Sequence, residues 1–120
     1  MTLSSAGALA AASFSGAGTG LTGGGALTGN VTINLVNGTF QNINVNSATT
    51  ITLPNSVAGK SFTIQTYFTS NSTITLAGGT SLKWASNTTP TATAVTGKVD
   101  IYNFMQDGNV TYGAIFGQNY

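Results

Sequence analysis

Short stretches in which apolar residues alternate with threonine or asparagine recur from about residue 30 onward. In VTINL at 31–35, Val31, Ile33 and Leu35 point to one side of a strand, while Thr32 and Asn34 point to the other. Similar patterns occupy 39–45, 49–53, 60–68, 72–76, 81–84, 99–106 and 109–116. A period of two is the period of a strand, so the sequence predicts a fold built from short strands with little helix.

Turn signals separate these strands. Asn37-Gly38, Gly78-Gly79 and Asp107-Gly108 each predict a two-residue hairpin turn. Pro54 ends the strand at 49–53 because it cannot donate to a strand ladder. No repeat of 20 to 50 residues is visible, which argues against a solenoid. Roughly eight short strands predict an all-β fold: one β-sandwich or jelly-roll-like domain over residues 30–120, preceded by an extended N-terminal arm over residues 1–29.

The expected arm is rich in glycine and alanine, and it contains the run GTGLTGGGALTG at 18–29. Glycine loses the most conformational freedom on ordering, so such a run is either a disordered tail or a segment that a partner surface holds in place. Apolar residues recur along it at irregular spacing, which favours the second interpretation. We expect it to act as an assembly arm through Leu9, Phe14, Leu21, Gly23, Gly24, Gly25 and Leu27.

Charge is scarce throughout the 120 residues. Charged residues make up 4% of the chain, against about 25% in an average protein, and the net charge is +1. Three scattered lysines cannot form the basic stripe that nucleic-acid binding requires. No apolar run approaches the ~20 residues that cross a membrane, so neither nucleic acid nor a membrane is expected as a partner. A surface so poor in charge favours a protein that lives in an assembly.

Candidate catalytic groups are equally few. The chain has no Cys and no His, which excludes metal sites built on them, and we expect no cofactor. The glycine run lacks the Gly-Lys-Ser/Thr of a phosphate-binding loop. Asp107 fits a turn role, and Asp100 lies between Lys98 and Tyr102 on one strand face. For Asp100 we favour a structural pairing and keep a recognition role as the alternative, so the sequence predicts no catalytic site.

The strand at 99–106 has apolar residues on both faces, as expected for a strand covered on both sides. Asp100, Tyr102 and Phe104 are therefore candidate interface residues. Trp84 and the tyrosines, among them Tyr67, Tyr102, Tyr112 and Tyr120, suit either a carbohydrate platform or core and interface packing, and we favour packing.

Two segments together resemble virion proteins of tailed bacteriophages. They are GTGLTGGGALTGNVTINL at 18–35 and KWASNTTPTATAVTGKVDIYNFMQDGNVTYGAIFG at 83–117. The first is similar to segments of tail fibres, and the second resembles the closing hairpin of β-rich phage structural domains. The resemblance implies an all-β homotrimer. It favours a capsid decoration or cement protein on the capsid surface, which binds the major capsid protein and neighbouring copies. A tail-fibre or spike adhesin for a receptor or glycan is the alternative.

Overall fold

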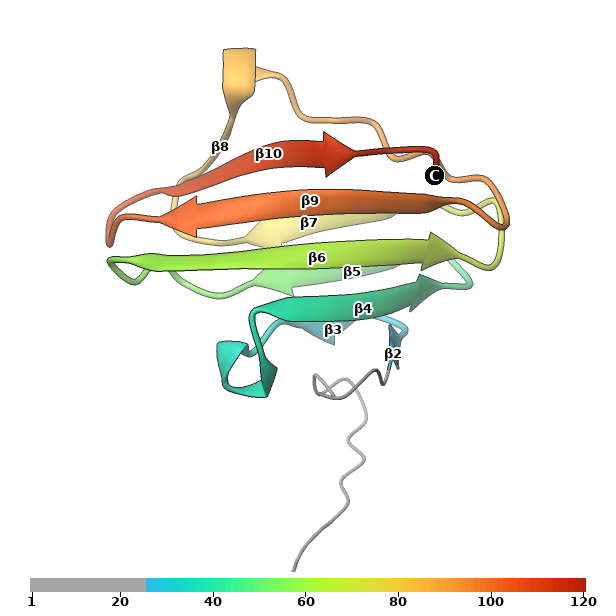
Figure 1. The fold of residues 1–120 in the computed structure, drawn as a ribbon, viewed down its shortest axis with the longest axis horizontal. Helices are drawn as coiled ribbons and strands as arrows, with labels where there is room; N and C mark the ends of the chain where they lie inside the picture. The colour runs from blue at the N-terminus through green and yellow to red at the C-terminus, as the bar shows by residue number, and fades with distance from the viewer. Residues whose placement is uncertain (1–25) are drawn as a thin grey trace, which may run out of the picture.

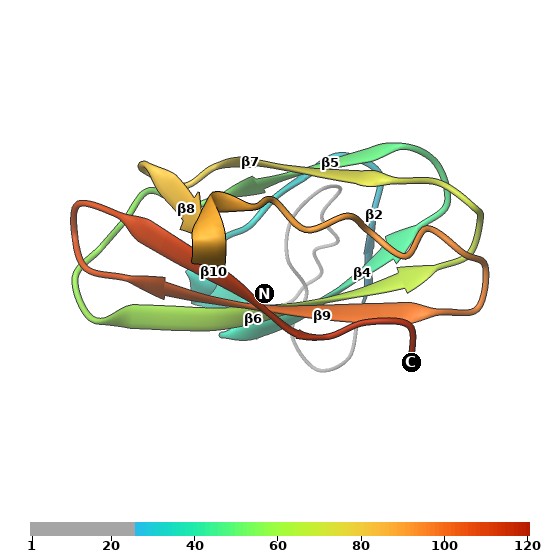
Figure 2. The ribbon, with the colours of Figure 1, turned by 90° about the horizontal axis from the view of Figure 1, so that it is seen from above.

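The chain passes back and forth between two facing β-sheets. The computed structural model describes residues 26–120, so the predictions for residues 1–25 lie outside it. One sheet has six strands in the order β2-β4-β6-β9-β10-β8, and the other has three in the order β3-β5-β7 (Figures 1 and 2). The strands are β2 (Ala26–Thr28), β3 (Val31–Thr32), β4 (Phe40–Val45), β5 (Thr49–Leu53), β6 (Lys60–Phe68), β7 (Ile74–Gly78), β8 (Leu82–Trp84), β9 (Val99–Gln106) and β10 (Thr111–Gly117). The predicted all-β fold is confirmed.

The first half of this fold is a stack of circuits. Strands β2, β4 and β6 pair in parallel in the large sheet, and β3, β5 and β7 pair in parallel in the small one. Val31 lies beside Ile51, so one circuit takes roughly 20 residues, the scale of a solenoid repeat. Thr49 lies beside Ile74, about 25 residues on, so the circuits stack in space without a fixed sequence period. Parallel pairing also departs from the antiparallel order of a jelly roll.

Two of the three predicted hairpins are wrong. At Asn37-Gly38 the chain makes the 3-10 turn η1 (Leu35–Asn37), in which Asn34 Oδ1 accepts a hydrogen bond from Val36 N at 3.0 Å. This turn carries the chain from β3 into β4, which belongs to the other sheet. The Gly78-Gly79 turn, with φ of 70° and 60°, likewise leads from β7 to β8 across the two sheets. A sharp turn fixes a change of direction, whereas the sheet that the next strand joins depends on packing.

The third hairpin is present, but its loop spans residues 107–110, longer than the predicted two-residue turn, since Gln106 pairs with Thr111. Strands β9 and β10 pair in antiparallel fashion on either side of the Asp107-Gly108 turn, and β9 also pairs in antiparallel fashion with β6. Asp107 Oδ1 accepts hydrogen bonds from Asn109 N at 2.8 Å and Val110 N at 2.7 Å. The ladder with β9 shifts register between Ile115 and Gly117, as in a β-bulge.

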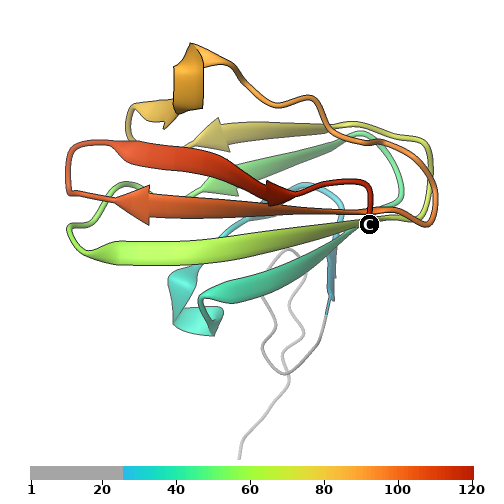
Figure 3. The same ribbon diagram turned by 45° about the horizontal axis from the view of Figure 1, so that its top comes forward.

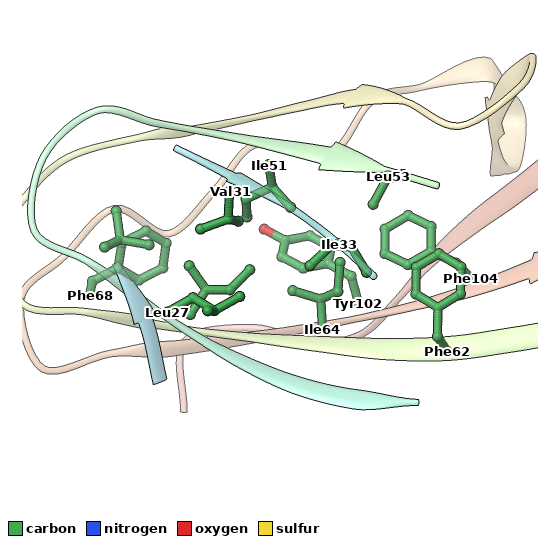
Figure 4. Close-up of a cluster of buried hydrophobic side chains, with 12 residues drawn as sticks. Leu27, Val31, Ile33, Ile51, Leu53, Phe62, Ile64, Phe68, Tyr102 and Phe104 are labelled. Atoms are coloured by element: carbon green, nitrogen blue, oxygen red, sulfur yellow. The ribbon is translucent and has the colours of Figure 1, made fainter. Parts of the chain in front are cut away.

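The core fills the space between the sheets (Figure 4). The rings of Phe62 and Phe104 stack with centroids 5.1 Å apart, and Trp84 meets Phe104 edge-on at 5.7 Å. The other buried apolar side chains are Leu27, Val31, Ile33, Ile43, Val45, Ile51, Leu53, Ile64, Phe68 and Tyr102. After the 3-10 turn η2 (Ala85–Asn87), the connection to β9 runs along the molecule (Figure 3). Its Ala92 and Ala94 pack against this core.

The base of the expected arm belongs to the sheet. Residues 26–28 form β2, which pairs with β4, and the Leu27 side chain is buried among the core residues. The predicted boundary between arm and domain at residues 29 and 30 therefore falls after the first strand of the large sheet. The arm residues before Ala26 lie outside the described part of the chain.

Candidate functional site

Asp100 is fully buried and accepts hydrogen bonds from several neutral groups. Its Oδ2 accepts from Thr93 N at 2.8 Å, Tyr102 OH at 3.1 Å and Gln118 Nε2 at 3.1 Å. Its Oδ1 accepts from Thr93 Oγ1 and from Asn119 N at 3.1 Å. The carboxylate thus joins β9 to the segment before it and to the C-terminal residues.

These hydrogen bonds decide the charge of Asp100. Burial works to raise the pKa of this carboxyl group, but hydrogen bonds from Thr93, Asn119 and Gln118 favour the ionised form and leave the pKa below its usual value. Burial and the neighbouring Asp100 charge both raise the pKa of Tyr102 far above its usual value. Asp100 therefore stays ionised near neutral pH, and Tyr102 stays protonated as a donor to it. This arrangement fixes the ends of β9 and β10 in place.

The second candidate is the side of the large sheet that faces away from the core, here called the outer face. Strand alternation places on it one side-chain row from each of β4, β6, β9 and β10. These residues are Phe40, Asn42, Asn44, Ser61, Thr63, Gln65, Tyr67, Val99, Ile101, Asn103, Met105, Tyr112, Ala114 and Phe116. All are uncharged. Phe40, Met105 and Phe116 are each more than half exposed.

A hollow of about 470 Å³ opens on the outer face near the Asp107-Gly108 turn. Its lining includes both apolar and polar residues, and none of them is charged. They are Thr39, Ser61, Phe62, Thr63, Asn103, Phe104, Met105, Tyr112, Gly113 and Ala114. A second hollow of about 370 Å³ adjoins it, lined by Phe40, Thr63, Ile101, Asn103 and Phe116. Together they form a continuous uncharged surface with both hydrogen-bonding and aromatic groups.

The structure places the predicted interface residues in two groups. Leu9, Phe14, Leu21, Gly23, Gly24 and Gly25 lie outside the described residues. Leu27, Asp100, Tyr102 and Phe104 are all buried inside the chain, with exposed fractions of 3% or less. Contacts within the same chain account for the burial of these four, so they offer no surface to a partner in this fold.

The suggested aromatic platform is dispersed. Trp84 and Tyr102 pack edge-on at 6.4 Å beside the core, whereas Tyr67 and Tyr112 are exposed on the outer face. Tyr67 pairs with Val99 and Tyr112 with Met105, which places the two tyrosines roughly 20 Å apart along the strands. Only Tyr112 lines the larger hollow.

Sequence reasoning missed the outer face as a unit. Its most exposed members, Phe40, Met105 and Phe116, were not among the predicted site residues. The signal was available in part, because they occupy the strand positions that alternate with the buried ones. The pairing order that brings Phe40 and Phe116 to one hollow could not be inferred from the strands taken singly.

Comparison with protein-family models gives no match, and comparisons with curated proteins and with solved structures give none either. No helix among residues 26–120 is long and apolar enough to cross a membrane. Within that range there is also no group of three His, Cys, Asp or Glu side chains that could hold a metal ion.

Proposed function

We propose that this chain is a non-enzymatic structural protein of a bacteriophage particle, a capsid decoration or cement protein on the capsid surface. In this role it binds the major capsid protein and neighbouring copies of itself, and it needs neither a cofactor nor nucleic acid. The observation that carries the proposal is strand β2, which holds the base of the N-terminal segment in the sheet (Figure 1). The resemblance of residues 18–35 and 83–117 to phage virion proteins supports it.

Strand β2 is suited to transmit force from the arm to the domain. It lies at the end of the large sheet, pairs with β4 at three positions, and anchors Leu27 in the core. The preceding sequence supplies the apolar residues Leu9, Phe14 and Leu21 for a partner surface. Burying each would contribute about 1.5–3 kcal/mol, while ordering costs roughly 1–2 kcal/mol per residue. The net gain per arm is small, so retention depends on many arms acting together.

The finer fold assignment belongs to this proposal. We interpret the two facing sheets as a two-layer sandwich whose first part is wound as parallel circuits and whose last part is an antiparallel hairpin. The domain would associate as a homotrimer, which also agrees with its scarcity of charge. Sedimentation velocity of the purified chain at micromolar concentration tests this point, with a trimer expected and a stable monomer counting against it.

A tail-fibre or spike adhesin is the alternative function. One observation favours it: the uncharged hollow on the outer face, which combines an exposed aromatic ring with amide and hydroxyl groups. Such a lining suits a receptor or glycan.

Immunogold electron microscopy of particles that carry the chain tests the two roles. Label spread over the shell is expected for a cement protein, label at the tail for an adhesin, and the absence of the chain from particles would overturn both. Two deletions then test the arm. Removing residues 1–25 keeps β2 and should leave a folded domain that no longer stays on particles. Removing residues 1–29 also removes Leu27 from the core, so it should lower stability as well.

A further inference from the structure

The larger hollow on the outer face has the chemistry of a binding site, and we propose that it binds a neutral saccharide. The proposal supplies a ligand class for the adhesin role, but it does not depend on either virion role. The arm leaves from β2 at one end of the strand order, whereas the hollow lies over β6, β9 and β10 toward the other end.

The polar groups of the hollow match a ligand rich in hydroxyls. Thr63 Oγ1 donates a hydrogen bond to Asn103 Oδ1 at 2.9 Å, which orients the amide and leaves its Nδ2 donors for a ligand. The exposed Ser61 hydroxyl lies on the neighbouring strand and can both donate and accept. Sugar hydroxyls also donate and accept, so this set can satisfy them without a charged partner.

The apolar groups match the C–H face of a pyranose ring. Tyr112 is 46% exposed and Met105 is 63% exposed, and the two residues pair across β10 and β9 at the hollow. The negative face of an aromatic ring attracts the positively polarised C–H groups of a sugar. Tyr112 OH lies 3.5 Å from Asp107 Oδ2, a contact that ties this ring to the adjacent turn.

The charge around the hollow favours a neutral ligand over an acidic one. None of its lining residues is charged. Three charged residues adjoin the lining: Asp107 beside Tyr112 OH, Lys83 opposite Tyr112 on β8, and Lys60 directly before Ser61 on β6. A phosphate or an acidic sugar would therefore find no cationic side chain among the lining residues to pair with.

In the test, the full chain is titrated with each member of a panel of oligosaccharides, and binding is followed by NMR. The neutral members are maltohexaose, cellohexaose, mannohexaose, galactotetraose and chitohexaose, and the acidic members are sialyllactose and a hyaluronan hexasaccharide. We expect a neutral member to bind with a millimolar or lower Kd and to shift the amide signals of Ser61, Asn103 and Tyr112. Tyr112→Ala and Asn103→Ala should each weaken this binding about tenfold.

Tyr67→Ala is the matched control, because Tyr67 is 41% exposed on the same face but lies outside the hollow. It should leave the affinity unchanged. The proposal is overturned if no neutral member binds, if an acidic member binds more tightly than all neutral ones, or if Tyr67→Ala weakens binding as much as Tyr112→Ala. None of these results would change the immunogold labelling that tests the virion role.

Discussion

The parallel circuits from β2 to β7 and the antiparallel hairpin of β9 and β10 follow opposite pairing rules within one domain. In the hairpin, Gln106 pairs with Thr111 across a short turn. In the circuits, Thr49 pairs with Ile74, and a strand of the other sheet lies between them in sequence. Turn chemistry can specify the first kind of pairing, whereas the second depends on contacts that are distant in sequence. The same kind of turn signal therefore leads to a paired neighbouring strand in the hairpin and to a strand of the other sheet in the circuits.

Both regions nevertheless contribute to one core. Phe62 of β6 stacks on Phe104 of β9, so the last parallel strand and the first hairpin strand share a contact. Strand β6 pairs with β4 along one edge, and the hairpin strand β9 pairs with its other edge. We therefore expect the two regions to unfold together, and the following predictions test this expectation.

The largest effect is expected from truncating the shared core. Phe104→Ala should lower the free energy of unfolding by about 3–5 kcal/mol, and Ile51→Ala in the circuits by about 2–5 kcal/mol, because both side chains are buried. Urea unfolding followed by fluorescence and circular dichroism measures both. Each variant should keep a single transition. Two separate transitions would show that the regions are independent, and the exposed Met105→Ala should change stability by less than about 0.5 kcal/mol.

Next in size is the polar anchor of the hairpin. Asp100→Asn should lower the free energy of unfolding by about 1.5–3 kcal/mol, because the new NH₂ group faces donors whichever oxygen it replaces: Thr93 N and Gln118 Nε2 at the Oδ2 position, or Asn119 N at the Oδ1 position. Urea unfolding at pH 7 checks this. Wild-type stability in the variant would show that the carboxylate is not needed to hold the two segments.

The same carboxylate predicts a pH dependence. Its pKa in the folded state lies below the ordinary value of 3.8, so its contribution is fully present above that value and is lost as pH falls through the folded pKa. Wild type should therefore lose more stability than Asp100→Asn between about pH 5 and pH 2. Asp107, whose pKa is also lowered, is present in both chains and cancels in the difference. If wild type and Asp100→Asn lost equal stability over this pH range, the lowered pKa of Asp100 would be contradicted.

A smaller loss is expected where β10 meets β8. A Cβ atom at Gly113 would lie 2.6 Å from the Trp84 ring, so Gly113→Ala should force that ring to shift and cost about 1–3 kcal/mol. Thermal unfolding measures the loss. Ala114→Ser is the control, because Ala114 is exposed and should tolerate the change.

The smallest effect is expected in the hairpin turn. Asp107→Asn should change stability by less than about 0.5 kcal/mol, because the Asn oxygen still accepts from Asn109 N and Val110 N. Asp107→Ala removes the acceptor and should cost about 1 kcal/mol. Equal losses in the two variants would mean that the side-chain acceptor does not matter.

Residue alternation was enough to predict most of the strands and the inward positions of Val31 and Ile33, because burial on one face imposes that period. It did not predict β2, which was assigned to the arm, and Leu35, expected in a strand, lies in η1. Alternation could not predict the partners of the strands. Asn37-Gly38 has the chemistry of a hairpin turn, yet β4 pairs with β2 and β6. Asp100 was recognised as a residue that needs partners. The actual donors, Thr93, Gln118 and Asn119, come from segments whose approach depends on the finished fold.

Winding by circuits makes the length of this domain adjustable. Each circuit pairs with the one before it through parallel strands, so an insertion of about one circuit between β5 and β6 would lengthen both sheets and leave the closing hairpin unchanged. Duplication within the gene could thus extend the molecule along its stacking direction without redesign of either end. A fold of this kind can change its dimension along the stacking direction in evolution by gaining or losing circuits, whereas a jelly roll would have to change all of its strand pairings.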